Sequence, residues 1–207
     1  MLVSLARVFS SPVGSPVGWA YYRQHPLEII AFWRGGLQGF GIYGSLAGGV
    51  LGVWLYARWE KLPFPRWLDY AAPGLVLAQA IGRWGNYFNQ ELYGPPTALP
   101  WGVFIEPAYR LAGLEAFERF HPVFLYESLL DVLICGFLFW LSRRPTRDGD
   151  IFFSYLILYA FVRFWLEFLR PDAWMAGGIA VAQIIALGCM AGAGIALYLR
   201  HRRKPAA

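Results

Sequence analysis

Apolar residues in this 207-residue chain gather into long runs, and charged residues gather between them. A helix that crosses a bilayer needs about 20 mostly apolar residues. The runs approach or reach that length and carry no visible internal repeat. We therefore expect five transmembrane helices, over residues 36–57, 68–84, 122–141, 151–169 and 178–199.

The loops between these runs predict how the chain is oriented. Lys and Arg concentrate in residues 58–66, 143–147 and 200–204, and short loops rich in these residues stay in the cytoplasm. Placing all three in the cytoplasm gives a consistent topology, in which the polar stretch 85–121 is an outward-facing periplasmic loop region with short helical pieces. The expected fold class is an all-α polytopic membrane protein, forming a single integral membrane domain over 1–207.

Composition supports the membrane interpretation. Hydrophobic residues make up 57% of the chain, and charged residues make up 15%, against about 25% in soluble domains. The net charge of +5 does not indicate nucleic-acid binding, because the basic residues lie at the ends of apolar runs. Cys135 and Cys189 lie inside apolar runs without partner ligands at fixed spacing, so we expect packing roles, no metal and no cofactor.

Several charged residues interrupt the apolar runs. Glu127 and Asp131 are four residues apart in 122–141, and Arg83 ends the run 68–84. A charge in hydrocarbon costs at least about 2.5–3.5 kcal/mol, so such residues face a partner or a cavity. In the run 151–169 a four-residue spacing predicts one polar stripe on a single helix face, made of Tyr155, Tyr159, Arg163 and Glu167.

Two interpretations of the arginines remain open. Arg163 can pair with Glu167 or with a carboxylate of 122–141 and hold the helices together. Alternatively, Arg83 and Arg163 converge on an anionic ligand, because a guanidinium keeps its charge and donates bidentate hydrogen bonds to phosphate. In a bilayer the nearest abundant phosphate is a lipid headgroup.

The stretch "IGRWGNYFNQELYG" at 81–94 concentrates polar residues at the end of an apolar run. Its glycines either allow close packing of helices or make room for a ligand. Asn86 and Asn89 either satisfy irregular backbone or organise a headgroup, and Glu91 is either a solvated carboxylate or part of the same site.

This stretch resembles the signature of the bacterial prolipoprotein diacylglyceryl transferase family, which reads approximately Gly-Arg-x-Gly-Asn-Phe-x-Asn-x-Glu. Three further segments are similar to the family in the same order: "HPLEIIAFWRGGLQG", "HPVFLYE" and "YAFVRFWLEFLRPD". The likeness runs from about residue 3 to residue 204.

The resemblance implies an inner-membrane enzyme whose active site faces the outer leaflet. Such enzymes transfer the diacylglyceryl group of phosphatidylglycerol to the thiol of a lipobox cysteine in a prolipoprotein signal peptide, and release glycerol-1-phosphate without a cofactor. By this likeness Arg83, Arg163 and Glu167 are the expected catalytic residues. The expected substrate-binding residues are Arg83, Asn86, Asn89, Glu91, Gly94, Tyr126, Tyr159 and Arg163.

The chain departs from the family pattern in two places. Phe40 stands where the family commonly has a histidine proposed as a base, which leaves His121 and Glu167 as candidate bases. The family has seven spans, so we also expect an N-terminally short member. These departures leave a non-catalytic or truncated phospholipid-binding paralogue as an alternative to the enzyme. The charges inside the apolar runs leave a second alternative, a small transporter whose buried charges line a path.

Overall fold

The computed structural model describes residues 42–61 and 63–202 of the chain. The chain divides into two units, Met1–Phe64 and Pro65–Ala207. In the first unit the described residues form helix α3 (Ile42–Trp59), whose glycine-rich sequence carries no acidic residue in its first turn and ends with Arg58 in its last turn. Phe40 and the start of the first predicted span lie outside the described residues.

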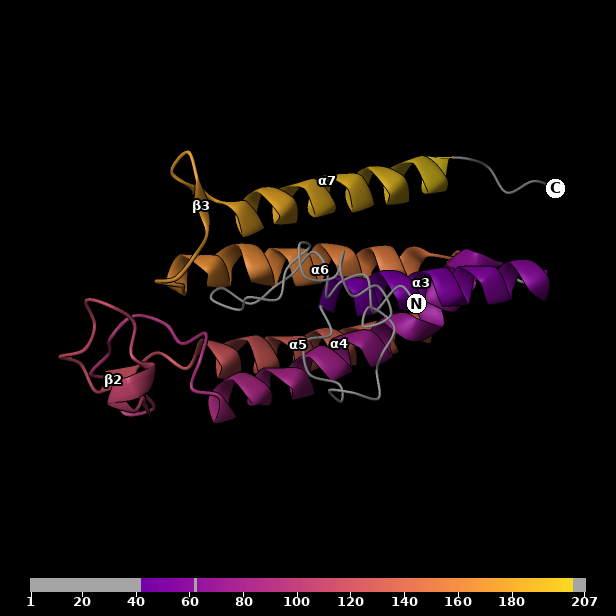
Figure 1. Ribbon diagram of the computed structural model, residues 1–207. Coiled ribbons are helices and arrows are strands. Elements are labelled where there is room, and N and C mark those ends of the chain that lie inside the picture. The colour runs from indigo at the N-terminus through magenta and orange to yellow at the C-terminus, as the bar shows by residue number, and fades with distance from the viewer. Residues whose placement is uncertain (1–41, 62, 203–207) are drawn as a thin grey trace, which may run out of the picture. The chain divides into compact units, whose positions relative to one another are not determined.

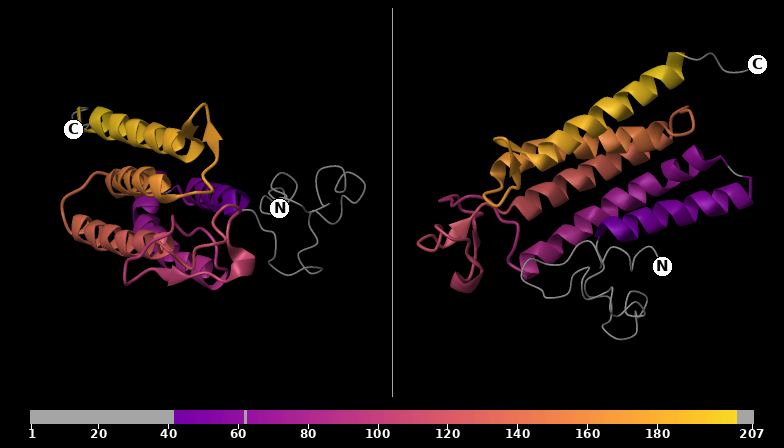
Figure 2. Two further views of the ribbon diagram at one scale, coloured as in Figure 1. Left: turned by 90° about the vertical axis from the view of Figure 1, so that its left-hand side faces the viewer. Right: turned by 45° about the horizontal axis from the view of Figure 1, so that its top comes forward.

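Four long helices run side by side in the second unit (Figure 1). They are α4 (Phe64–Phe88), which begins at the boundary between the units, α5 (Val123–Ser142), α6 (Asp150–Leu166) and α7 (Val181–Arg202). Helix α6 packs against both α5 and α7, and the two turned views agree on this order (Figure 2). Helix α4 joins α5 through Ser128, whose hydroxyl donates to the carbonyl of Ala80 at 2.8 Å.

Three helical segments are long and apolar enough to cross a membrane: Val123–Ser142, Asp150–Leu169 and Val181–Arg202. They coincide closely with the last three spans expected from the sequence. Helices α3 and α4 occupy the positions of the first two expected spans, but neither belongs to this group of described helices. The protein is therefore a mostly helical membrane protein, and the number of five spans stays a prediction.

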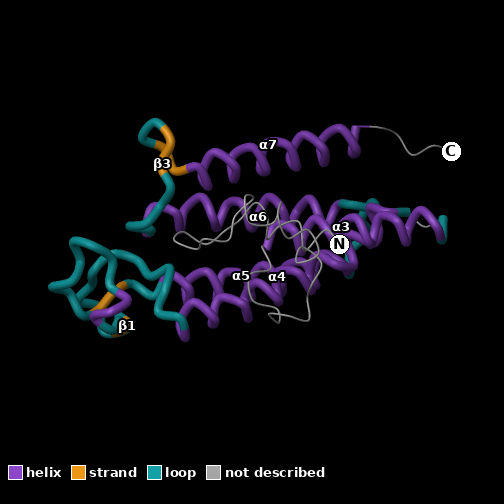
Figure 3. Tube along the Cα trace, viewed as in Figure 1, coloured by secondary structure: helices purple, strands orange, loops and turns teal. Residues whose placement is uncertain are grey.

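The polar region between α4 and α5 contains more structure than its sequence indicates. Helix α4 continues to Phe88, so the helix ends later than the predicted boundary at residue 84. A short antiparallel pair follows, made of β1 (Val103–Phe104) and β2 (Arg119–Phe120), with the 3-10 helix η2 (Pro107–Tyr109) between them. The helical piece agrees with the expectation, whereas the strands were not predicted (Figure 3).

The connection between α6 and α7 is also ordered. The 3-10 helix η3 (Glu167–Leu169) continues directly from α6. An antiparallel hairpin of β3 (Met175–Ala176) and β4 (Ile179–Ala180) then leads into α7, and its turn uses Gly177 and Gly178 at φ of 59° and 86°. Both ordered connections lie at the same end of the four helices (Figure 3).

Two buried clusters hold the second unit together. The larger one lies between the helices and consists of Ala72, Val76, Val123, Ile134, Cys135, Leu138, Ile151, Tyr155, Val162 and Leu166. The smaller one lies in the loop region and consists of Tyr93, Ile105 and Phe120. Burial raises the pKa of Tyr93, and its hydroxyl donates to the carbonyl of Tyr109 at 2.8 Å. The smaller cluster therefore holds the loop region itself together.

Asp69 on α4 stabilises the start of α6 at the opposite end of the helices. Its carboxylate accepts hydrogen bonds from the backbone N–H groups of Gly149 and Phe152, the latter at 2.9 Å. The first N–H groups of a helix have no partner within the helix, so a side-chain acceptor satisfies them. Asp69 is 6% exposed, so these hydrogen bonds are largely shielded from solvent.

Replacing Asp69 with Ala should lower the free energy of unfolding by about 1–3 kcal/mol, because two buried N–H groups lose their acceptor. Denaturant unfolding in detergent micelles, followed by circular dichroism, measures the loss. The control is Asp148→Ala, which removes a carboxylate that pairs with Arg66 at an exposed site. That control should change stability little, and an equal loss in both variants would contradict the capping role of Asp69.

Candidate functional site

Glu127 lies between the two arginines that the sequence analysis singled out. Its carboxylate is 2% exposed, and Arg83 and Arg163 approach its two oxygens at 2.9 and 3.1 Å. The three residues come from α4, α5 and α6, so this contact joins three helices. A buried carboxylate needs such partners, because an unpaired charge away from water is strongly disfavoured.

The arginine cluster extends toward the ordered end of α6. Arg163 also binds Glu167 at 2.9 Å, so it pairs with both of the partners that the sequence left open. Arg170 lies three residues after Glu167 and approaches the same Oε2 atom at 3.6 Å. Arg170 binds Asp172 through two of its nitrogens, at 3.2 and 3.0 Å.

Tyr159 lies between Arg83 and Glu127. Its hydroxyl is 3.4 Å from the Arg83 Nη2 atom and donates to the Glu127 Oε1 atom over the same distance. The ring of Tyr155 stacks on Tyr159 with centroids 5.9 Å apart, and its hydroxyl donates to Gln79 at 3.1 Å. The polar stripe predicted on one face of 151–169 thus faces α4 and α5.

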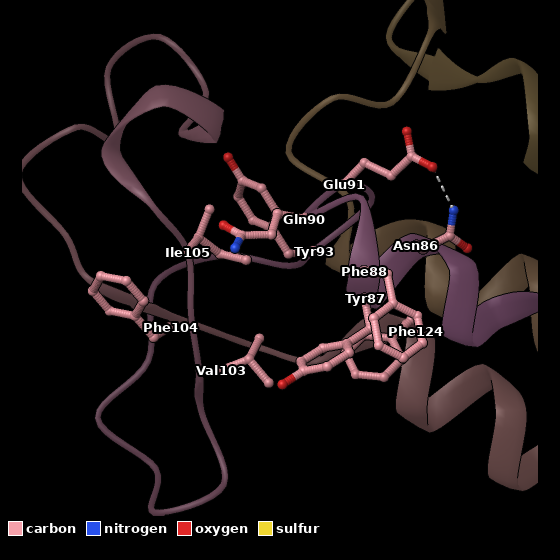
Figure 4. A pocket seen from close by; sticks show the side chains of 10 residues that line it. All are labelled: Asn86, Tyr87, Phe88, Gln90, Glu91, Tyr93, Val103, Phe104, Ile105 and Phe124. Carbon is pink, nitrogen blue, oxygen red and sulfur yellow. Dashed lines mark hydrogen bonds between the residues drawn. The ribbon is translucent and has the colours of Figure 1, made fainter.

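The motif residues after Arg83 form a second chain of hydrogen bonds. Arg83 donates to the Asn86 side-chain oxygen at 3.5 Å. Asn86 then donates to the Oε1 atom of Glu91 at 3.0 Å (Figure 4), and Asn89 donates to the same oxygen at 3.2 Å. The structure therefore connects these four predicted site residues, with Arg83 common to both hydrogen-bond systems.

The loop that carries Glu91 has an unusual backbone. Gln90 and Leu92, on either side of it, adopt left-handed conformations with φ of 52° and 54°. Such conformations cost about 1–2 kcal/mol for residues with a side chain, and they persist where the surroundings impose them. Here the Glu91 N–H bonds to the Asn86 carbonyl at 3.0 Å, so the strained turn brings the Glu91 carboxylate back to the motif.

Gly94 has a packing role. A Cβ atom at this position would lie 2.8 Å from the His121 Cβ atom, 2.9 Å from a methyl of Val123 and 3.1 Å from the carbonyl oxygen of Leu169. The backbone N–H of Gly94 donates to the His121 carbonyl at 2.8 Å. Gly94 thus permits the loop to lie against the start of α5 and the end of α6.

Tyr126 lies in a different hydrogen-bond group from the arginines. Its hydroxyl accepts from the indole N–H of Trp101 at 2.9 Å and lies 3.0 Å from the Nδ1 atom of His121. An indole N–H only donates, so the Tyr126 hydroxyl is free to donate to Nδ1. In either direction of this hydrogen bond, the Nδ1 atom of His121 is occupied by the tyrosine.

The residues of the arginine cluster line a small recess. Arg83, Arg163 and Arg170 line it together with Asn86, Leu92, Val123, Phe124 and Glu127. The side chains of Arg83 and Arg163 keep 23% and 18% of their surface exposed, so both can reach a ligand while bound to Glu127. The carboxylates of Glu127, Glu167 and Asp172 balance the charges of the three arginines, so the feature that suits an anionic phosphate group is the set of partly exposed guanidinium N–H donors.

Two residues of this site were missed as site residues in the sequence. Glu127 was recognised as an intramembrane charge, but not as the common partner of both arginines. Arg170 lies in the quoted segment "YAFVRFWLEFLRPD", three residues after Glu167, and lines the recess. Asp131 was expected to face a partner, yet among the described residues its two carboxylate oxygens have no hydrogen-bond partner.

Within residues 42–61 and 63–202, no group of three or more His, Cys, Asp or Glu side chains is placed to hold a metal ion. The expected absence of a cofactor stays a prediction.

The geometry defines a membrane protein with an arginine-rich recess at one end of its helices. Residues 3–200 match the family described as prolipoprotein diacylglyceryl transferase. The chain is 43% identical over 196 residues to the phosphatidylglycerol–prolipoprotein diacylglyceryl transferase of Trichormus variabilis, with 90% of this chain and 68% of that protein covered. It is 39% identical over 209 residues to the protein of that name from Chloroflexus aggregans, with 89% and 68% covered. The chain belongs to the prolipoprotein diacylglyceryl transferase family.

Replacing Glu127 with Gln should lower the free energy of unfolding by about 3–5 kcal/mol, because two partly buried arginines lose their common anion. Denaturant unfolding in detergent micelles measures this loss. The matched control is Glu106→Gln, at an exposed position in the loop region, which should leave stability unchanged. A stable Glu127→Gln protein would show that the arginines do not need this carboxylate.

Replacing Gly94 with Ala should cost about 1–3 kcal/mol of stability, because the added methyl overlaps atoms of three surrounding residues. Gly82→Ala is the control within the same motif, since no described atom lies within 4 Å of a Cβ atom there. Thermal unfolding of both variants in the same detergent compares them directly. A greater loss for Gly82→Ala would contradict the close packing at Gly94.

Proposed function

We propose that this protein transfers the diacylglyceryl group of phosphatidylglycerol to the thiol of the lipobox cysteine of prolipoproteins and releases glycerol-1-phosphate. The observation that carries the proposal is the pair Arg83 and Arg163, held on the two oxygens of buried Glu127 beside a small recess. Relatives at 39–43% identity that bear the transferase name support the same activity.

In the proposed reaction the cysteine thiolate attacks the glyceryl carbon that is bonded to a phosphodiester oxygen. A C–S bond forms, the C–O bond breaks, and the released phosphate takes the bonding electron pair. The leaving group therefore gains negative charge as the bond breaks. Arg83 and Arg163 are positioned to stabilise that charge without reorganising, because Glu127 already fixes both guanidinium groups.

The thiol must lose its proton before the attack, and Glu167 is the acceptor that we propose. Both of its arginine contacts go to the Oε2 atom, so Oε1 is the oxygen that can take a proton. His121, the other candidate from the sequence, has its Nδ1 atom next to the Tyr126 hydroxyl. The nearby arginines also favour the thiolate, since cations lower the pKa of a cysteine thiol.

The remaining site residues are proposed to position the substrates. Asn86, Asn89 and Glu91 form one hydrogen-bonded group next to Arg83, which suits the hydroxyl groups of a glycerol headgroup. Tyr159 aligns Arg83 with Glu127, Gly94 allows the loop to close on the helices, and Tyr126 orders the adjoining loop.

We further propose a multi-pass location in the bacterial inner membrane, with the site toward the outer leaflet. The recess lies at the helix end opposite Arg66, Arg143 and Arg200, which belong to segments rich in Lys and Arg, and such segments favour the cytoplasm. An exported prolipoprotein would present its cysteine on the same side as the recess.

The direct test incubates the full chain in membranes with phosphatidylglycerol and a peptide that contains a lipobox cysteine. Mass spectrometry should detect a thioether-linked diacylglyceryl peptide, and Arg83→Ala should abolish it. Arg143→Ala, at the exposed far end of α5, should retain the activity. Phosphatidylglycerol binding without product would favour the non-catalytic paralogue instead.

Arg163→Lys should reduce turnover by about 100-fold, because lysine keeps the charge but cannot hold Glu127 and Glu167 with two nitrogens while facing a phosphate. The assay above, run at saturating concentrations of both substrates, measures this change. Arg143→Lys is the control for the same substitution. Unchanged turnover in Arg163→Lys would mean that only the charge at this position matters.

A further inference from the structure

A cavity of about 350 Å³ adjoins the arginine recess, and the proposed reaction makes no use of its apolar walls. Its walls are largely aromatic and apolar, with a polar rim on one side (Figure 4). The lining residues are Asn86, Tyr87, Phe88, Gln90, Glu91, Tyr93, Val103, Phe104, Ile105 and Phe124. Its volume falls in the range of small-ligand pockets.

The position of the cavity relates it to the proposed chemistry. Asn86 and Phe124 line both the cavity and the arginine recess, so the two share a wall. A group bound in the cavity therefore lies next to a phosphate held by Arg83. The cavity belongs either to the lipid donor or to the acceptor polypeptide.

The depth of the cavity argues against an acyl chain. Helix α5 has 20 residues, which at 1.5 Å per residue span about 30 Å, the thickness of the hydrocarbon layer. Val103, Phe104 and Ile105 come from the loop region that precedes the start of α5. These three lining residues thus lie beyond the start of α5, at the depth where lipid headgroups and water begin.

The polar rim suits a peptide backbone. Gln90 accepts the Glu106 N–H at 2.7 Å through its side-chain oxygen, and among the described residues its amide nitrogen has no partner. Glu91 receives both asparagine donors on Oε1, which leaves Oε2 as an acceptor. The rim therefore offers one donor and one acceptor beside an apolar pocket, which matches the C=O and N–H groups flanking an apolar side chain.

We propose that this cavity binds an apolar side chain of the acceptor polypeptide next to its reactive cysteine. The inference rests on the proposed function and adds the place where the second substrate is recognised. Phe104 and Phe88 are 52% and 77% exposed, so a bound segment would cover aromatic surface that now faces solvent. Binding there would direct the neighbouring thiol toward the arginine recess.

The experiment compares Phe104→Ala with Phe117→Ala in the full chain, using phosphatidylglycerol and a cysteine-containing apolar peptide. Both phenylalanines lie in the loop region and are about half exposed, at 52% and 49%, but only Phe104 lines the cavity. Phe104→Ala should raise the KM for the peptide about tenfold, the effect of losing a small apolar contact in a pocket. The KM for phosphatidylglycerol and the kcat should not change, and Phe117→Ala should match the unaltered protein.

A second test uses a variant that fills the cavity instead of enlarging it, together with a control. Val103→Trp should also raise the KM for the peptide, whereas Val132→Trp, at an exposed position on α5, should not. A rise in the KM for phosphatidylglycerol alone would assign the cavity to the lipid and overturn the proposal. An unchanged KM for the peptide in both Phe104→Ala and Val103→Trp would also overturn it.

Photocrosslinking tests the cavity without turnover. A peptide with a photoreactive residue next to its cysteine should label residues 103–105 of the unaltered chain. Labelling elsewhere would overturn the proposal, even if the transferase assay succeeds. Labelling at 103–105 without any transferase product would support the binding of the peptide in this cavity. It would count only against the proposed function.

Discussion

The site depends on one buried carboxylate that two arginines share. Glu127 offers one oxygen to Arg83 and the other to Arg163, and each of the three residues belongs to a different helix. Removing either arginine would leave the carboxylate poorly compensated in an apolar interior. The cluster therefore fixes the relative positions of α4, α5 and α6 and at the same time keeps two cations at the edge of a recess.

Rigidity on the loop side comes from other sources. The small cluster of Tyr93, Ile105 and Phe120 anchors the segment between α4 and α5. Gly94 lets this segment approach the helix ends closely, and two left-handed residues bend the chain around Glu91. The recess and the adjoining cavity are thus built by long helices on one side and by a compact loop on the other.

The sequence was sufficient for the parts that repeat a simple pattern. Apolar length predicted the helices, and the four-residue spacing predicted that Tyr159, Arg163 and Glu167 would share a face. It could not show that Glu127 joins Arg83 to Arg163, because that contact depends on how three helices pack. Arg170 was missed because it lies three residues after Glu167, outside the strict four-residue spacing of the stripe, and the strands of two residues each are too short to produce an alternating pattern.

The hydrogen bonds between Asp69 and the start of α6 bear on how the chain is assembled. Asp69 precedes Gly149 by 80 residues, so α4 is synthesised well before α6. Because chains are made from the N-terminus, the acceptor for the first turn of α6 is already present when that helix emerges from the ribosome. The order of the helices along the gene thus provides the N–H groups of Gly149 and Phe152 with their acceptor at the time of membrane insertion.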